Sequence, residues 1–121
     1  KNIDDFPENS RALLRGGFYA DRVTKNGIEV GKIFSKLAEK TNLTPAQLAI
    51  LWVKDQPGIT APLIGPRTLN QLKDLLPVSE LKLGEDIRMA CDNLVPPGSV
   101  LANFHNTADW MKSKIDWEIK K

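Results

Sequence analysis

One short apolar segment constrains this chain more than any other feature. Residues 59–64, Ile-Thr-Ala-Pro-Leu-Ile, lie between a Pro-Gly pair and a Gly-Pro pair and have the pattern of a buried β-strand. Pro62 weakens this prediction, because proline cannot donate a hydrogen bond to a strand ladder. The 121 residues contain no second good strand candidate, and a lone strand cannot form a sheet with its own chain. The sequence therefore predicts a piece of a larger α/β protein, which, if stable alone, associates with itself or folds mainly as helices.

Helical patterns precede this segment. Residues 28–40 carry an apolar stripe at helical spacing. The sequence Thr44-Pro45-Ala46-Gln47 then combines a capping box with a proline at the first helical position. We expect the following body, residues 48–53, to be buried all round, because it is apolar on every side. Residues 1–27 are expected to be irregular, apart from a short helix capped by Asn9-Ser10.

Two further helices are expected after the strand. Thr68 and Gln71 form a second capping box and predict a helix over residues 68–76, with an apolar face made of leucines and an end at Pro77. Residues 85–94 carry acidic residues at the start and an apolar stripe along one side, which predicts the last helix.

Composition excludes several classes of protein. The chain is 41% hydrophobic and 26% charged, which is typical of a soluble globular domain. Its net charge of +2, with scattered lysines, is too small to indicate nucleic-acid binding. No segment approaches the roughly 18 apolar residues of a membrane span. The single cysteine, Cys91, excludes an intrachain disulfide and favours the cytoplasm, and its apolar helical surroundings predict a buried thiol rather than a nucleophile or a metal ligand.

The order of motifs within residues 37–76 is distinctive. It begins with Leu37-Ala38-Glu39-Lys40-Thr41-Asn42-Leu43-Thr44-Pro45-Ala46-Gln47-Leu48-Ala49, continues through Trp52-Val53 and Pro57 to Thr68, and ends with Asn70-Gln71-Leu72-Lys73-Asp74-Leu75-Leu76. This order and spacing resemble the end of the barrel in the aldo-keto reductases, which are nicotinamide-dependent oxidoreductases. The resemblance implies a (β/α)8 TIM barrel, an α/β fold that typically needs about 250 residues. The chain is thus expected to be a C-terminal fragment of that barrel, mostly helical when isolated.

The resemblance also divides the chain into parts, as one partial reductase domain over residues 1–121. These parts are the loop after strand 7 (1–27), a helix pair (28–56), strand 8 (59–64), a helix on the cofactor side (68–76), a further helix (85–94) and a C-terminal tail (95–121).

The resemblance implies no catalytic residue in this chain. The catalytic acid of the family is a tyrosine, supported by lysine, aspartate and histidine, and these four residues come from earlier strands. Tyr19 is the only tyrosine and His105 the only histidine here, and neither lies in the catalytic motif. The 121 residues alone are therefore expected to lack reductase activity.

The loop after the expected strand is the candidate cofactor site. Barrel enzymes commonly bind phosphate there, since amides at a helix start and a nearby arginine favour an anion. By resemblance, Gly65 and Arg67 match positions around the adenosine 2′-phosphate, and Gln71 and Asp74 match positions at the adenine. This favours NADP(H) and leaves NAD(H) open. Leu75 stands where the family often has asparagine, so one adenine contact is expected to be absent.

Each of these residues also has a purely structural explanation. Gly65 can serve a tight turn, Gln71 its own capping box and Asp74 a solvated helix surface. Arg67 is the residue that structure alone explains least. In the tail, Phe104, Trp110 and Met111 are equally compatible with lining a substrate pocket and with filling a core.

Three functions follow from these patterns. The first is the C-terminal part of an NADP(H)-dependent enzyme that reduces aldehydes or ketones, whose partners are the cofactor, a carbonyl substrate and the missing N-terminal part of the barrel. The second is a self-associating helical module without a catalytic role. The third, a helix-turn-helix module, is disfavoured because its recognition helix is too apolar and the net charge is small. No nucleic-acid or membrane partner is expected.

Overall fold

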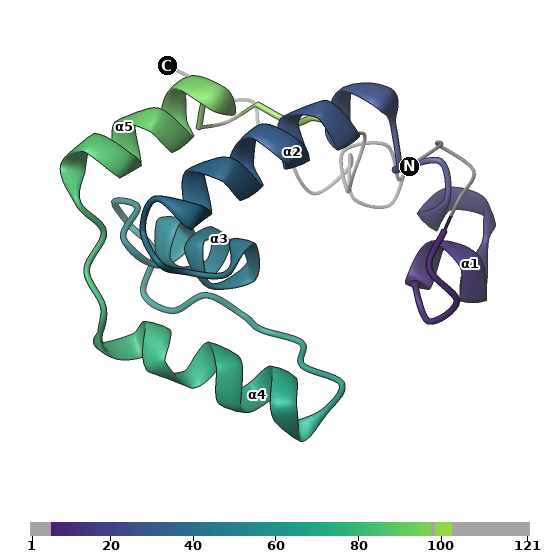
Figure 1. The fold of residues 1–121 in the computed structure, drawn as a ribbon, viewed down its shortest axis with the longest axis horizontal. Coiled ribbons are helices and arrows are strands. Elements are labelled where there is room, and N and C mark those ends of the chain that lie inside the picture. Colours follow the sequence, from purple (N-terminus) through teal and green to yellow (C-terminus); the bar gives the residue numbers. More distant parts are fainter. Residues whose placement is uncertain (1–5, 98, 103–121) are drawn as a thin grey trace, which may run out of the picture. The chain divides into compact units, whose positions relative to one another are not determined.

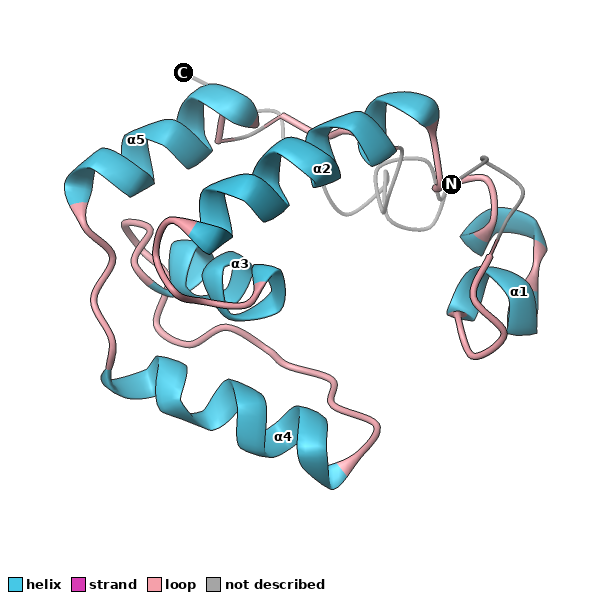
Figure 2. Ribbon diagram, in the orientation of Figure 1, coloured by secondary structure: helices cyan, strands magenta, loops and turns pink. Residues whose placement is uncertain are grey.

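The computed structural model describes residues 6–97 and 99–102, and the chain divides into two compact units. The first unit contains the chain up to Glu29 and from Gly98 onward, and the second is Val30–Pro97. All regular structure within the described residues is helical, as Figures 1 and 2 show. None of the helices found there has the length and apolar character needed to cross a bilayer.

The first unit is built from short turns. Helix α1, Arg11–Arg15, begins where the Ser10 hydroxyl accepts a hydrogen bond from the Leu13 amide at 3.2 Å, which confirms the expected cap. The helix ends at Gly16, and the 3-10 helix η1, Gly17–Tyr19, follows directly.

Helix α2, Lys25–Glu39, runs from the first unit into the second. It begins three residues before the predicted start, because the Thr24 hydroxyl accepts a hydrogen bond from the Gly27 amide at 3.0 Å.

The core of the second unit is formed where α2 meets two later helices. These are α3, Pro45–Lys54, and α5, Glu85–Leu94. Ala38, Leu48 and Cys91, one residue from each helix, form a buried cluster at which every residue is at most 3% exposed. The predicted capping box at Thr44 is confirmed, since Thr44 and Gln47 exchange hydrogen bonds of 2.9 and 3.2 Å.

A second helical segment packs against α3. Helix α4, Leu69–Leu75, starts at the predicted cap, Thr68, and passes directly into the 3-10 helix η2, Leu76–Glu80. Both α4 and η2 contact α3, and Val78 of η2 is buried. Pro77 therefore ends the α-helix as predicted but does not end the helical segment, because a proline in the first turn of η2 lacks only an amide that needs no helical partner there.

The predicted strand at residues 59–64 does not form. This segment is an extended loop in Figure 2, and its apolar side chains are exposed: Ile59 by 43%, Leu63 by 101% and Ile64 by 40%. The physical reason is that no second strand exists among the described residues to pair with it. The expectation of a mainly helical chain is confirmed, whereas the expectation of one short buried strand is wrong.

Two other burial predictions are also only partly met. In α3, Leu48 and Leu51 are buried, but Ala49, Ile50, Trp52 and Val53 are only half-buried. Along the α4 segment, Leu69 is 64% and Leu76 is 56% exposed. The second unit thus leaves apolar surface uncovered on the side of α4 and the extended segment.

Candidate functional site

A pocket of about 350 Å³ lies between α3, α4 and the extended segment. Its lining consists of Ala46, Ile50, Leu63, Ile64, Gly65, Pro66, Arg67, Gln71, Asp74 and Leu75. The four residues predicted from the sequence to contact the cofactor are all among them. The structure therefore brings together Gly65, Arg67, Gln71 and Asp74 at one cavity, whose volume is in the range of small-molecule sites.

Gly65 leaves open space at the edge of this pocket. A Cβ atom placed on Gly65 would meet no other atom within 4 Å, and the φ angle of Gly65 is not positive. The alternative explanation, a tight turn that only glycine can adopt, is therefore not supported. The absence of a side chain does leave room for a ligand to approach the backbone closely.

At the start of α4, several polar groups form hydrogen bonds with one another. The Gln71 side-chain oxygen accepts hydrogen bonds from the amides of Arg67, at 2.7 Å, and Thr68, at 3.2 Å. The Gln71 amide in turn donates to the Thr68 hydroxyl at 3.2 Å. Gln71 thus serves the capping box, and the expectation of outward-pointing amides is wrong for Arg67, Thr68 and Gln71. These amides are therefore occupied within the cap, and the Arg67 side chain is exposed beside them.

Asp74 links α4 to the start of α3. The Gln47 side-chain nitrogen donates to the Asp74 carbonyl at 2.7 Å and to its carboxylate at 3.2 Å. The Thr44 hydroxyl lies 3.4 Å from the other carboxylate oxygen. Asp74 is therefore not simply a solvated surface residue, although its carboxylate retains acceptor capacity on the pocket side. Nothing in the sequence indicated the contact with Gln47, whose pattern predicted only a cap.

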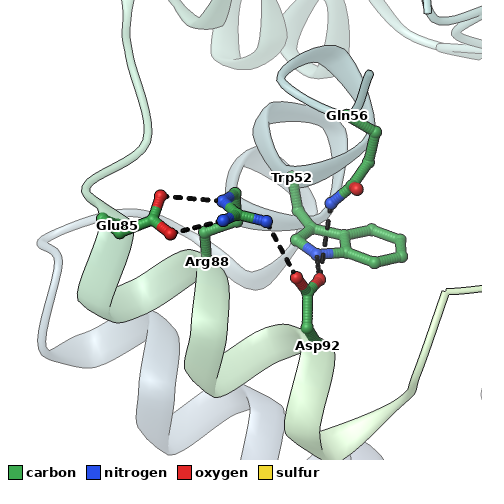
Figure 3. A network of polar contacts seen from close by, with 5 residues as sticks. All are labelled: Trp52, Gln56, Glu85, Arg88 and Asp92. Atoms are coloured by element: carbon green, nitrogen blue, oxygen red, sulfur yellow. Dashed lines mark hydrogen bonds and ion pairs between the residues drawn. The ribbon is translucent and has the colours of Figure 1, made fainter. Parts of the chain in front are cut away.

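A second polar cluster joins α3 to α5 on the other side of α3 (Figure 3). The Trp52 indole donates to Asp92 at 2.7 Å, Arg88 donates to the other Asp92 oxygen at 3.1 Å, and Gln56 approaches Asp92 at 3.4 Å. Arg88 also pairs with Glu85, and this hydrogen bond holds the pKa of the Glu85 carboxyl below its ordinary value. Each polar side chain in this cluster has a partner within it, so the cluster links the two helices.

The other residues considered from the sequence provide no additional site. Cys91 is buried as predicted, and burial, together with the nearby negative charge of Asp92, raises the pKa of its thiol, which disfavours the reactive thiolate. Tyr19 lies in the first unit, half-buried against arginine side chains. His105, Phe104, Trp110 and Met111 lie outside the described residues. No group of residues suited to hold a metal ion occurs in the part of the chain that is described.

Comparison with known proteins identifies the family. The model of the aldo/keto reductase family matches residues 1–95. The chain therefore belongs to the aldo/keto reductase family of oxidoreductases, as the resemblance in residues 37–76 had indicated.

Three relatives show how much of such a protein the chain represents. The uncharacterized oxidoreductase YrpG of Bacillus subtilis is 36% identical over 90 residues, which cover 74% of this chain and 27% of that protein. The aldo-keto reductase yakc of Schizosaccharomyces pombe, named with NADP(+), is 31% identical over 117 residues, covering 88% of this chain and 34% of the relative. Protein tas of Escherichia coli is 37% identical over 83 residues, 67% of this chain and 23% of its own length. The chain thus spans about a third or less of these relatives, and no solved structure matches it significantly.

Proposed function

We propose that this chain supplies the adenosine-phosphate side of the NADP(H) site in an aldo-keto reductase that reduces aldehydes or ketones. One observation carries the proposal: Gly65, Arg67, Gln71 and Asp74, selected from the sequence, line one open pocket. A relative named with NADP(+) supports the choice of cofactor.

The residues of the pocket fit an adenosine that bears a phosphate. The Arg67 guanidinium has the planar donor geometry that phosphate oxygens accept, and the open space at Gly65 allows the backbone to lie against the ligand. Ile50, Leu63 and Leu75 provide apolar wall for an adenine ring, and the Asp74 carboxylate can accept from its amino group. When bound, the nicotinamide of the cofactor supplies the hydride, while these residues hold its distant end in place.

The groups that protonate the carbonyl oxygen are proposed to come from outside these 121 residues. Tyr19 does not lie in the catalytic motif of the family, three arginines lie against its ring, and the chain spans 27% of one relative and 34% of another. We therefore expect the isolated chain to bind cofactor without turning over a carbonyl substrate. The single cysteine, Cys91, excludes an intrachain disulfide, which favours a reducing compartment such as the cytoplasm.

The test is a titration of the purified chain with NADPH and NADH. Replacing Arg67 with alanine should weaken NADPH binding by about tenfold to a hundredfold, the effect of losing a charged hydrogen bond, and should change NADH binding little. Lys73→Ala is the matched control, because Lys73 is an exposed cation of α4 that does not line the pocket. Equal NADPH affinity in the Arg67→Ala and Lys73→Ala chains would contradict the proposal.

The exposed apolar segment favours a second candidate function. Leu63 is fully exposed, and Ile59 and Ile64 in the same extended segment are also exposed. The backbone N–H and C=O groups of such a segment can pair with another strand. In this alternative the chain is a self-associating module, or joins the rest of a barrel, without binding cofactor by itself. A dimer seen by light scattering that Leu63→Lys abolishes, in a chain that does not bind NADPH, would favour this alternative.

A further inference from the structure

The side chain of Gln47 reaches one of the four residues of the candidate cofactor site from outside the pocket. Gln47 belongs to α3 and is half-buried, and it does not itself line the pocket, whereas Ala46 and Ile50 of the same helix do. Its side-chain nitrogen donates to the Asp74 carbonyl at 2.7 Å and to the Asp74 carboxylate at 3.2 Å, which links α3 to α4 (both helices are marked in Figure 1). Helix α3 therefore contacts the site directly through Asp74.

The orientation of the Gln47 amide follows from the cap of α3. The Thr44 backbone N–H can only donate, so the Gln47 atom that it meets at 2.9 Å must be the oxygen. The nitrogen of the same planar amide is then the atom that faces Asp74. Exchanging the two atoms would set a donor against the Thr44 N–H and an acceptor against the Asp74 oxygens. The cap thus makes Gln47 a hydrogen-bond donor toward α4.

Both oxygens of the Asp74 carboxylate are held from the side of α3. Gln47 donates to one oxygen at 3.2 Å, and the Thr44 hydroxyl lies 3.4 Å from the other. An exposed aspartate on a helix otherwise samples several rotamers, and each rotamer directs the carboxylate differently. Each carboxylate oxygen has two acceptor positions, so these contacts orient the group and still leave acceptor capacity for a ligand.

We propose that Gln47 is a positioning residue, which makes the site select adenine over a purine that lacks the amino group. The role of Gln47 rests on the proposed function, in which the Asp74 carboxylate accepts from the adenine amino group. A carboxylate that is already held in place loses less conformational freedom when it binds this group, which favours binding. Hypoxanthine carries a carbonyl oxygen in place of the amino group, and a fixed carboxylate repels that oxygen. A carboxylate that is free to turn would avoid it, so Gln47 acts on the choice of base through Asp74.

The test compares two ligands of the purified chain, NADPH and reduced nicotinamide hypoxanthine dinucleotide phosphate. The wild type should bind NADPH about tenfold more tightly than this analogue, the effect of one hydrogen bond to a charged group. Gln47→Ala should lower the ratio of the two affinities by about threefold to tenfold, the cost of ordering a side chain that is no longer held. A loss of packing alone would weaken both ligands equally and leave this ratio unchanged.

Gln56→Ala is the matched control, because it makes the same chemical change just after the other end of α3. Gln56 contacts Asp92 at 3.4 Å and does not line the pocket, so the affinity ratio should keep its wild-type value. Asp74→Ala should abolish the preference for NADPH, and adding Gln47→Ala to this variant should change the ratio no further, because Gln47 acts through Asp74. A further fall of the ratio in the double variant would overturn the proposal.

A second variant keeps the test decisive if Gln47→Ala does not fold. Gln47→Met retains a long side chain with high helical propensity and removes the polar atoms, so the ratio should fall as it does with alanine. An unchanged ratio in the folded Gln47 variants, or equal binding of the two ligands by the wild type, would overturn the role of Gln47 and leave the proposed function standing. A wild-type chain that binds neither ligand would contradict the proposed function itself, so the two failures are distinguishable.

Discussion

One side of helix α3 is packed against other helices, and another side borders an open pocket. Toward α2 and α5 it buries Leu48 fully, and Trp52 donates to Asp92 at 2.7 Å (Figure 3). Toward α4 and the extended segment it borders an open pocket, and Leu63 nearby is entirely exposed. On the first side apolar and polar groups find partners within this chain, whereas on the second side apolar side chains stay exposed among the described residues.

The two sides of α3 differ in how far the described residues cover their apolar surface. A packed interface with paired polar groups is stable by itself, since burial and hydrogen bonding are both complete. An apolar segment without a strand partner needs another chain, another part of the protein or a ligand to cover it. The two sides should therefore respond differently to mutation.

The largest expected difference is between two leucines. Leu48→Ala should lower the free energy of unfolding by about 2–5 kcal/mol, because it opens a cavity in the core. Leu63→Ala should change it by no more than about 0.5 kcal/mol, because Leu63 is 101% exposed. Urea denaturation measures both values. Comparable losses for the two variants would mean that residues 59–64 are packed in solution.

A smaller loss is expected from the polar cluster between α3 and α5. Trp52→Phe removes the donor to Asp92 and should cost about 1.5 kcal/mol, the lower end for a hydrogen bond to a charged group. Gln56→Ala removes a longer contact of 3.4 Å and should cost less. Denaturation of both variants at the same pH gives the comparison, and a larger loss from Gln56→Ala would show that Trp52 does not anchor the cluster.

The free energy of unfolding should also depend on pH through Asp55, which lies just after α3. Burial raises the pKa of its carboxyl, but the Lys54 ammonium at 2.7 Å and the Leu83 amide at 2.6 Å outweigh burial and hold this pKa below its ordinary value of 3.8. A carboxyl with a lowered pKa contributes stability that is present above its unfolded pKa and is lost as the pH falls through its folded pKa. The stability difference between the wild type and Asp55→Asn should thus be constant near neutral pH and shrink below about pH 4. A difference that grows on acidification would reverse this sign.

The smallest effect on stability is expected on the open side. Asp74→Asn preserves the carbonyl acceptor for Gln47 and removes only charge from an exposed position, so the free energy of unfolding should change by less than about 0.5 kcal/mol. Under the proposed function, the same variant should weaken NADPH binding measurably. A variant that loses stability but keeps its NADPH affinity would make Asp74 a purely structural residue.

Helix boundaries were predictable because local groups determine them. The caps at Ser10, Thr44 and Thr68 involve residues three positions apart, and the structure confirms each of them. The cap at Thr24 was not anticipated, so α2 begins earlier than its apolar stripe indicated. The local sequence could not decide whether residues 59–64 form a strand, because a strand exists only when a partner segment supplies its hydrogen bonds.

The site was predicted less completely than the helices. The family resemblance selected four residues, and the structure places them at one pocket. The same resemblance did not show that Gln71 caps α4 with its oxygen or that Gln47 reaches Asp74. The Gln71 cap follows capping-box spacing, whereas the contact between Gln47 and Asp74 joins positions 27 residues apart, which no spacing rule in the sequence encodes.

The side chain of Gln47 restricts which residues can replace it. In an ordinary capping box glutamine and glutamate are interchangeable, since each offers an oxygen to the cap amide. Here the oxygen of Gln47 accepts from Thr44 while its nitrogen donates to Asp74, so glutamate would keep the cap and set two carboxylates against each other. A substitution that is conservative elsewhere would therefore weaken the polar link between α4 and α3 in this protein.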